Sequence, residues 1–223
     1  MIGPLGTRRY RDRRHAGRVL AAHVRPHVAG TKSIILGLPR GGVPVAYEIA
    51  TALDVLLDVL VVRKLGVPGY GELAFGAIAE GADPVLNRPL IAMLAISPSE
   101  IAATIERERE ELERRERTYR SGRPQADCAG RTTVLVDDGL ATGATMSAAI
   151  EAVRSRGAEC VVAAAPVGPR ETLALLESLA DAVVCPLVPA PLDGVGSWYD
   201  DFSQVPDAQI RNLLHEAAVA RGA

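Results

Sequence analysis

Residues 134–146 read Val-Leu-Val-Asp-Asp-Gly-Leu-Ala-Thr-Gly-Ala-Thr-Met, and this stretch decides the fold of the chain. Its three apolar residues predict a buried strand. The strand ends at two adjacent carboxylates, Asp137 and Asp138, and a loop rich in glycine and threonine follows. Residues 146–156 then have the periodicity of a helix. A strand, an acidic pair, a small-residue loop and a helix therefore follow one another without interruption.

This order of elements is typical of a phosphate site. Gly139 and Gly143 allow backbone N–H groups to approach an anion closely, and the first turn of the helix supplies unpaired donors and a positive dipole end. Thr142 and Thr145 add hydroxyl donors. Carboxylates repel a bare phosphate, so we expect the acidic pair to face sugar hydroxyls or a hydrated divalent cation. No lysine follows the glycines, and the order Gly-x-Gly-x-x-Gly is missing, so this is neither a Walker loop nor a dinucleotide loop.

Composition predicts one globular domain over residues 1–223 in the cytoplasm. The chain is 48% hydrophobic and 23% charged, with a formal net charge of −2, which gives no support for a nucleic-acid surface. No apolar run approaches membrane-spanning length. The three cysteines, Cys128, Cys160 and Cys185, are far apart and form no CxxC pair, so we expect neither a metal site nor a nucleophile among them.

Further strand-and-helix units flank the central stretch and predict an α/β fold. Residues 33–38 form an apolar strand that runs into Pro-Arg-Gly-Gly at 39–42, where Arg40 supplies a positive fork. Other apolar runs occupy 55–62, 160–165 and 182–188. Their alternation with helices predicts an open parallel sheet of about five strands with helices on both faces. Ligands in such sheets bind at the carboxyl ends of the strands, where the polar residues converge.

Three other segments have features that bear on function. Residues 65–87 are glycine-rich and predict a long loop, within which residues 73–79 could form a short strand. Residues 189–205 are irregular and hold a group of aromatic and acidic side chains that could stack on a planar ligand or latch the tail in place. Residues 10–28 predict an amphipathic helix, with a basic cluster before and within it that is a phosphate or partner contact or, more simply, a solvated arm. That cluster consists of Arg8, Arg9, Arg11, Arg13 and Arg14.

The motif Val-Leu-Val-Asp-Asp-Gly-Leu-Ala-Thr-Gly-Ala-Thr at 134–145 resembles the phosphoribosyl pyrophosphate (PRPP) signature of type I phosphoribosyltransferases. Leu-Pro-Arg-Gly-Gly at 38–42 is similar to the pyrophosphate loop of the same family, and the resemblance covers roughly residues 33–188. It implies transfer of the 5-phosphoribosyl group of PRPP to a nitrogenous base, with Mg²⁺ as cofactor and pyrophosphate as product. It also implies a second copy of the chain as a partner, in a homodimer.

The resemblance assigns roles to individual residues. Asp137 and Asp138 would hold the ribose hydroxyls and place Mg²⁺, and Lys64 would assist them at the pyrophosphate, although a basic strand cap is the alternative interpretation of Arg63-Lys64. The glycine-rich segment 65–87 would be a flexible loop that closes over the reaction, and 189–205 would be a hood over the base. The implied PRPP-binding residues are Arg40, Gly41, Gly42, Arg63, Gly139, Leu140, Ala141, Thr142, Gly143, Ala144 and Thr145. The implied base-binding residues are Trp198, Tyr199, Asp200 and Phe202.

Two other classes of protein share parts of this pattern. Some relatives keep the PRPP site but regulate gene expression, and such regulators generally need a nucleic-acid surface, for which the basic cluster is a weak candidate. A PRPP synthase-like enzyme would need an ATP site and a longer chain of two domains. The sequence shows neither of these, so it favours the transferase.

Overall fold

The structure is a computed structural model, and it describes residues 9–68, 70–120 and 122–221. Arg8 of the basic cluster lies outside the described residues. Five of the strands form one parallel sheet in the order β2-β1-β6-β7-β8. These strands are β1 (Ser33–Gly37), β2 (Leu56–Val59), β6 (Thr132–Val136), β7 (Cys160–Ala164) and β8 (Ala182–Val184). The predicted α/β fold with five parallel strands is confirmed.

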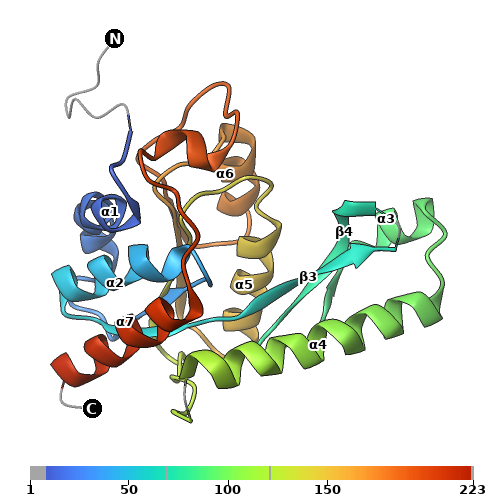
Figure 1. Cartoon of the computed structure of the whole chain (residues 1–223), viewed down its shortest axis with the longest axis horizontal. Coiled ribbons are helices and arrows are strands. Elements are labelled where there is room, and N and C mark those ends of the chain that lie inside the picture. The colour runs from blue at the N-terminus through green and yellow to red at the C-terminus, as the bar shows by residue number, and fades with distance from the viewer. Residues whose placement is uncertain (1–8, 69, 121, 222–223) are drawn as a thin grey trace.

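Helices cover both faces of this sheet (Figure 1). The strands are apolar on both sides, as buried parallel strands must be. In β6, Val134 and Val136 pack in the same apolar cluster as residues of α1 (Arg13–Val28), α2 (Gly42–Leu53) and α7 (Asp207–Ala220). Leu135 points the other way, into the cluster formed with α5 (Ala144–Ser155) and α6 (Arg170–Glu177). Because successive side chains of β6 point to opposite faces of the sheet, the two clusters correspond to two layers of helices.

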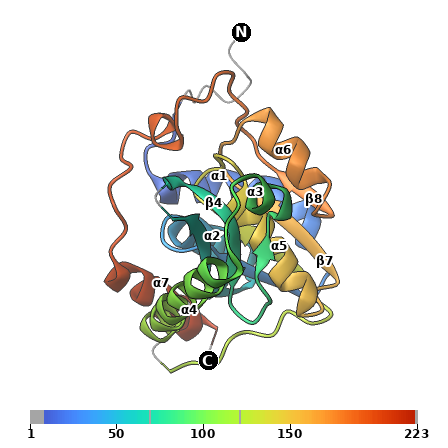
Figure 2. The ribbon, with the colours of Figure 1, turned by 90° about the vertical axis from the view of Figure 1, so that its right-hand side faces the viewer.

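Residues 62–68 and 70–120 form an arm that projects from the main sheet (Figure 1), and Figure 2 views the molecule from the side on which the arm lies. Its strands are antiparallel and lie in the order β3-β4-β5, with β3 (Val62–Val67), β4 (Tyr70–Ala79) and β5 (Val85–Leu86). A short helix, α3 (Arg88–Met93), and a long one, α4 (Pro98–Arg120), complete it.

The arm corrects the interpretation of 65–87 as a loop, because most of this segment is in strands. Glycine suggests a turn in sequence, but at Gly76 it serves a close approach of two strands. A Cβ at that position would lie 2.3 Å from the carbonyl oxygen of Val85. Glycine inside a strand often marks such an approach of another backbone.

A reciprocal pair of hydrogen bonds holds the start of α4. The Ser97 N–H donates to Glu100 Oε2 at 2.9 Å, and the Glu100 N–H donates to Ser97 Oγ at 3.2 Å. This reciprocal pair is a capping box, which satisfies two donors that the first helical turn leaves free. Leu112 and Tyr119 of the helix are buried, and its acidic and arginine residues pair along the outside.

Candidate functional site

The direction in which successive strands are added to the sheet reverses between β1 and β6. From β1 the chain moves outward to β2, and from β6 it moves outward the other way to β7 and β8. The loops that follow β1 and β6 therefore open side by side at the carboxyl edge. A crevice at such a switch point is the usual place for a ligand in an open α/β sheet.

The acidic pair lies at this edge, directly after β6. The Asp137 N–H donates to the Ala164 carbonyl at 3.1 Å, and Asp137 Oδ1 accepts from the Asp138 N–H at 2.8 Å. Removal from water raises the pKa of Asp137 well above its usual range, and the negative charge of Asp138 beside it raises the pKa further. The pair is therefore a site where added positive charge or hydroxyl donors would be stabilised.

The Arg40-Gly41-Gly42 loop packs directly on the acidic pair. A Cβ built at Gly41 would lie 1.8 Å from Asp138 Oδ2, and one at Gly42 would lie 2.3 Å from the Val136 carbonyl oxygen. Neither position has room for a side chain, so both glycines are required by contact. Arg40 is exposed beside them, and the peptide bond between Pro39 and Arg40 is cis. The two motifs found in the sequence are thus one structural unit.

The loop after the acidic pair leads into α5. Gly143, which precedes the helix, has a φ of 77°. The carbonyl of Gly143 accepts the hydrogen bond of the Ser147 N–H at 2.8 Å. The N–H groups before Ser147 in the first turn therefore have no partner within the helix. Thr142 and Ala144 are exposed, and Thr145 is half-buried.

The segment that follows β7, together with α6, holds the rest of this loop in place. Leu140 is buried, and its N–H donates to the Val167 carbonyl at 2.8 Å, so Leu140 anchors the loop. The hydroxyl of Thr172 donates to the Ala141 carbonyl at 2.6 Å. Gly139 faces Val195 of the hood, since a Cβ there would come within 2.2 Å of Val195 Cγ1.

Arg63 and Lys64 do not cap a strand of the main sheet. β2 ends at Val59, and the basic pair lies in β3, the first strand of the arm. Arg63 is bound to Glu108 of α4, with Nη2 to Oε2 at 2.6 Å, whereas Lys64 is exposed. The sequence suggested a strand end because the apolar run 55–62 continues across the break between β2 and β3.

The hood residues differ in accessibility. Tyr199 is buried, its ring lies 5.6 Å from that of Tyr10, and its hydroxyl donates to the Asp138 carbonyl at 2.5 Å. Its place favours the latch that the sequence left open. Trp198 and Phe202 are half-buried, and Asp200 is exposed.

Arg13 is a site residue that sequence reasoning passed over. Its Nε donates to Asp138 Oδ2 at 2.7 Å, in an ion pair whose side chains are 12% and 16% exposed. In the sequence it was one of five arginines in the basic cluster. Asp12 caps α1, because its Oδ1 accepts a hydrogen bond from the His15 N–H at 2.7 Å. The position of Arg13 directly after this cap, as the first residue of the helix, is the one sequence signal that distinguishes it from the other arginines.

Sequence comparison places this geometry in a known family. A sequence model of the phosphoribosyl transferase domain matches residues 12–192, which include both loops and the acidic pair. This chain belongs to the phosphoribosyl transferase domain family. Two proteins of Mycobacterium tuberculosis strains, both provisionally named as phosphoribosyl transferases, are 45% identical to it over 206 residues, or 92% of this chain. The chain spans 46% of the length of these relatives.

A solved structure supports the fold of this phosphoribosyl transferase domain. The crystal structure of TT1426 from Thermus thermophilus is 44% identical to it and matches with a TM-score of 0.81. The match covers 93% of this chain and 98% of that one. The arrangement of the main sheet and arm is therefore shared with an independently determined structure.

The acidic pair of this phosphoribosyl transferase domain fits a Mg²⁺ ion bound together with its substrate. Among the described residues, no group of three or more His, Cys, Asp or Glu side chains is placed to hold a metal by itself. Mg²⁺ usually takes only one or two carboxylates and completes its shell with phosphate oxygens and water. Asp137 and Asp138 are the donors that the domain would contribute.

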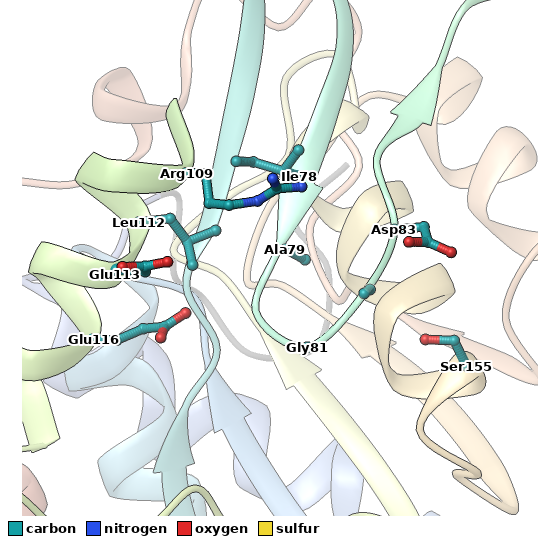
Figure 3. A pocket seen from close by; sticks show the side chains of 10 residues that line it. Ile78, Ala79, Gly81, Asp83, Arg109, Leu112, Glu113, Glu116 and Ser155 are labelled. Atoms are coloured by element: carbon teal, nitrogen blue, oxygen red, sulfur yellow. The ribbon is translucent and has the colours of Figure 1, made fainter. Parts of the chain in front are cut away.

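A separate cavity of about 490 Å³ lies away from the acidic pair, between the arm and α5 (Figure 3). Arg109, Glu113 and Glu116 of α4 line one side of it, and Asp83 and Ser155 line the other. None of the residues in the two site loops borders it.

In the described part of the phosphoribosyl transferase domain, no helix has the length and apolar character needed to cross a membrane.

Proposed function

We propose that this domain transfers the 5-phosphoribosyl group of PRPP to a nitrogenous base and releases pyrophosphate. The observation that carries the proposal is the contact of Gly41 with Asp138, which joins a glycine-rich anion loop to a carboxylate pair. PRPP offers matching chemistry, because its ribose hydroxyls lie between a 5′-phosphate and a pyrophosphate. No other class of function has a comparable observation in its favour.

Each part of PRPP has a proposed partner. The N–H groups of residues 141–145 and the hydroxyls of Thr142 and Thr145 bind the 5′-phosphate at the start of α5. Asp137 and Asp138 accept hydrogen bonds from the ribose hydroxyls. Arg40 and the backbone of Gly41 and Gly42 bind the pyrophosphate, and Arg63 and Lys64 reach it from the arm.

The reaction follows from these positions. The bond between ribose C1 and the pyrophosphate oxygen breaks, and its electron pair leaves with pyrophosphate, while a lone pair of the base nitrogen forms the new bond to C1. The carboxylates near the ribose favour the positive charge that develops on the sugar. Mg²⁺, when bound, neutralises charge on the leaving pyrophosphate. The remaining contribution of the chain is to hold both reactants in line.

The base and the assembly are further proposals. We propose that the acceptor is a purine- or pyrimidine-type base covered by the hood, where Trp198, Phe202 and Asp200 provide planar surface and a hydrogen-bond acceptor. A second, smaller cavity of about 220 Å³ borders the hood at Asp201, Ser203 and Gln204. We also propose a homodimer, which light scattering of the purified chain would test.

Two measurements test this function. Calorimetric titration of PRPP with Mg²⁺ is followed by an assay of pyrophosphate release across a panel of bases. We expect binding, with release for one base, and we expect Asp137→Asn combined with Asp138→Asn to lose at least about 100-fold in turnover while the variant stays folded by circular dichroism. Binding without release for any base would favour a PRPP-binding regulator. Absence of binding would contradict the proposal.

A further inference from the structure

One arginine side chain links the hood to the carboxylate of Asp138. Arg13, the first residue of α1, donates from Nε to Asp138 Oδ2 at 2.7 Å and from Nη1 to the Ser203 carbonyl at 2.7 Å. Its guanidinium lies over the ring of Phe202, with 3.9 Å from Cζ to the ring centroid. A planar fork is suited to such simultaneous contacts, which a lysine ammonium could not reproduce.

This arginine holds one carboxylate oxygen of Asp138, Oδ2. Oδ2 lies over Gly41, at 1.8 Å from the Cβ position that glycine leaves empty, and Arg13 Nε is 3.0 Å from that position. Oδ2 is thus enclosed by Gly41 and Arg13. The hydrogen bond of Tyr199 to the Asp138 carbonyl holds the backbone of the same residue. With Oδ2 and the backbone both held, Oδ1 has a defined direction.

We propose that Arg13 is a positioning residue, which holds Asp138 so that Oδ1 accepts a ribose hydroxyl, and which couples that contact to the hood. The inference rests on the proposed function, since it assigns the ribose to Asp138. Arg13 does not touch the ribose and acts through the carboxylate. It therefore affects the affinity for ligands that contain ribose and leaves the affinity for pyrophosphate unchanged.

The test compares three ligands on two variants. Arg13→Ala removes the positioning contact, and Arg18→Ala is the control, because Arg18 lies further along α1 and pairs with Glu48 at 3.1 Å. Dissociation constants are measured without Mg²⁺, because Asp138 is also a proposed Mg²⁺ donor, for PRPP, ribose 5-phosphate and inorganic pyrophosphate. For Arg13→Ala we expect the values for the two ribose ligands to rise about tenfold and the pyrophosphate value to change less than about twofold.

A third variant separates charge from geometry. Arg13→Lys retains the positive charge but not the fork, so we expect most of the loss in ribose affinity to persist. Equal weakening of all three ligands would mean a general electrostatic effect and would overturn the inference. Tighter PRPP binding by Arg13→Ala would also overturn it, because Arg13 would then compete with the ribose. Unchanged affinity for every ligand would do the same.

If the wild type does not bind PRPP, that result contradicts the proposed function but does not test the role of Arg13. A measurement without ligand tests that role separately. Trp198 is the single tryptophan of the chain, and it lies in the hood. We expect the double variant Arg13→Ala, Asp138→Asn to shift its fluorescence no further than Arg13→Ala alone, since Asp138 acts on the hood through Arg13. Additive shifts would show that Arg13 holds the hood independently of Asp138, against the inference.

Discussion

At the scale of single residues, the adjacent glycines Gly41 and Gly42 after β1 have different structural roles. The Cβ that is missing at Gly41 would meet a side-chain carboxylate, whereas the one missing at Gly42 would meet the backbone of β6, at the Val136 carbonyl and at 2.9 Å from Asp137 Cα. A side chain can rotate away, but a strand in the middle of a sheet cannot. The first glycine therefore serves the site and the second serves the fold.

This difference predicts opposite phenotypes for two alanine variants. Gly41→Ala should fold with near-normal stability but displace the Asp138 carboxylate, and so weaken PRPP binding by about tenfold or more. Gly42→Ala should lower the free energy of unfolding by about 1–3 kcal/mol because overpacking separates β1 from β6. Urea unfolding and PRPP titration of both variants check this. Normal PRPP affinity in Gly41→Ala would remove that glycine from the site.

At the scale of elements, a buried arginine joins the arm to the main sheet. Arg120, the last residue of α4, lies 3.3 Å from Asp58 of β2, pairs with Glu80 after β4, and donates to the Val59 carbonyl at 2.6 Å. All three charged side chains are buried. A buried charge network is costly to form but strongly destabilising to break, because it leaves charges without a partner.

We therefore expect Arg120→Ala to lower the free energy of unfolding by about 3–5 kcal/mol, since Asp58 and Glu80 would stay buried without their cation. The matched control is Arg117→Ala in the same helix, where an exposed pair with Glu113 at 3.7 Å is lost. That control should cost less than about 1 kcal/mol. Urea titrations of the two variants give the comparison, and similar costs would contradict the buried network as the tie between arm and sheet.

At the scale of the whole molecule, the arm and the body meet around an acidic region beside the cavity of Figure 3. Burial raises the pKa of Glu116 from the ordinary 4.5 to about 7, and the negative charge of Glu80 adds to this shift. A carboxyl group whose pKa is raised on folding is protonated in the folded state and charged in the unfolded state between these two values. The contribution of Glu116 to the free energy of unfolding is therefore at its full value below about pH 4.5 and is lost as the pH rises to 7.

This linkage predicts that Glu116→Gln stabilises the protein at high pH only. The expected gain is about 1–2 kcal/mol at about pH 8, after allowance for solvent around the half-buried carboxyl, and none at about pH 4. The measurement is the difference in unfolding free energy between the variant and wild type at both pH values. A gain of equal size at both would contradict the raised pKa.

Much of the architecture could be predicted because its signals are local. The apolar runs that became β1, β6 and β7 are continuous, and each crossover helix follows in sequence. Their parallel order brings Arg40-Gly41-Gly42 and Asp137-Asp138 to one edge without further information. The capping box at Ser97 and Glu100 is equally local, since its partners are three residues apart. The sequence alone therefore determined the sheet, the edge at which the two loops meet, and the family.

Only the tertiary structure decided which distant residues complete that edge. Arg13 and Asp138 are separated by 125 positions, and Tyr199 and Asp138 by 61. The strands of 65–87 likewise depend on pairing between segments whose glycines look like turns in isolation. Such contacts depend on how helices and hood pack over the sheet, and residue spacing does not encode that packing. The physical reason is that periodicity records which face of an element is buried, whereas the partner on that face is chosen by the whole fold.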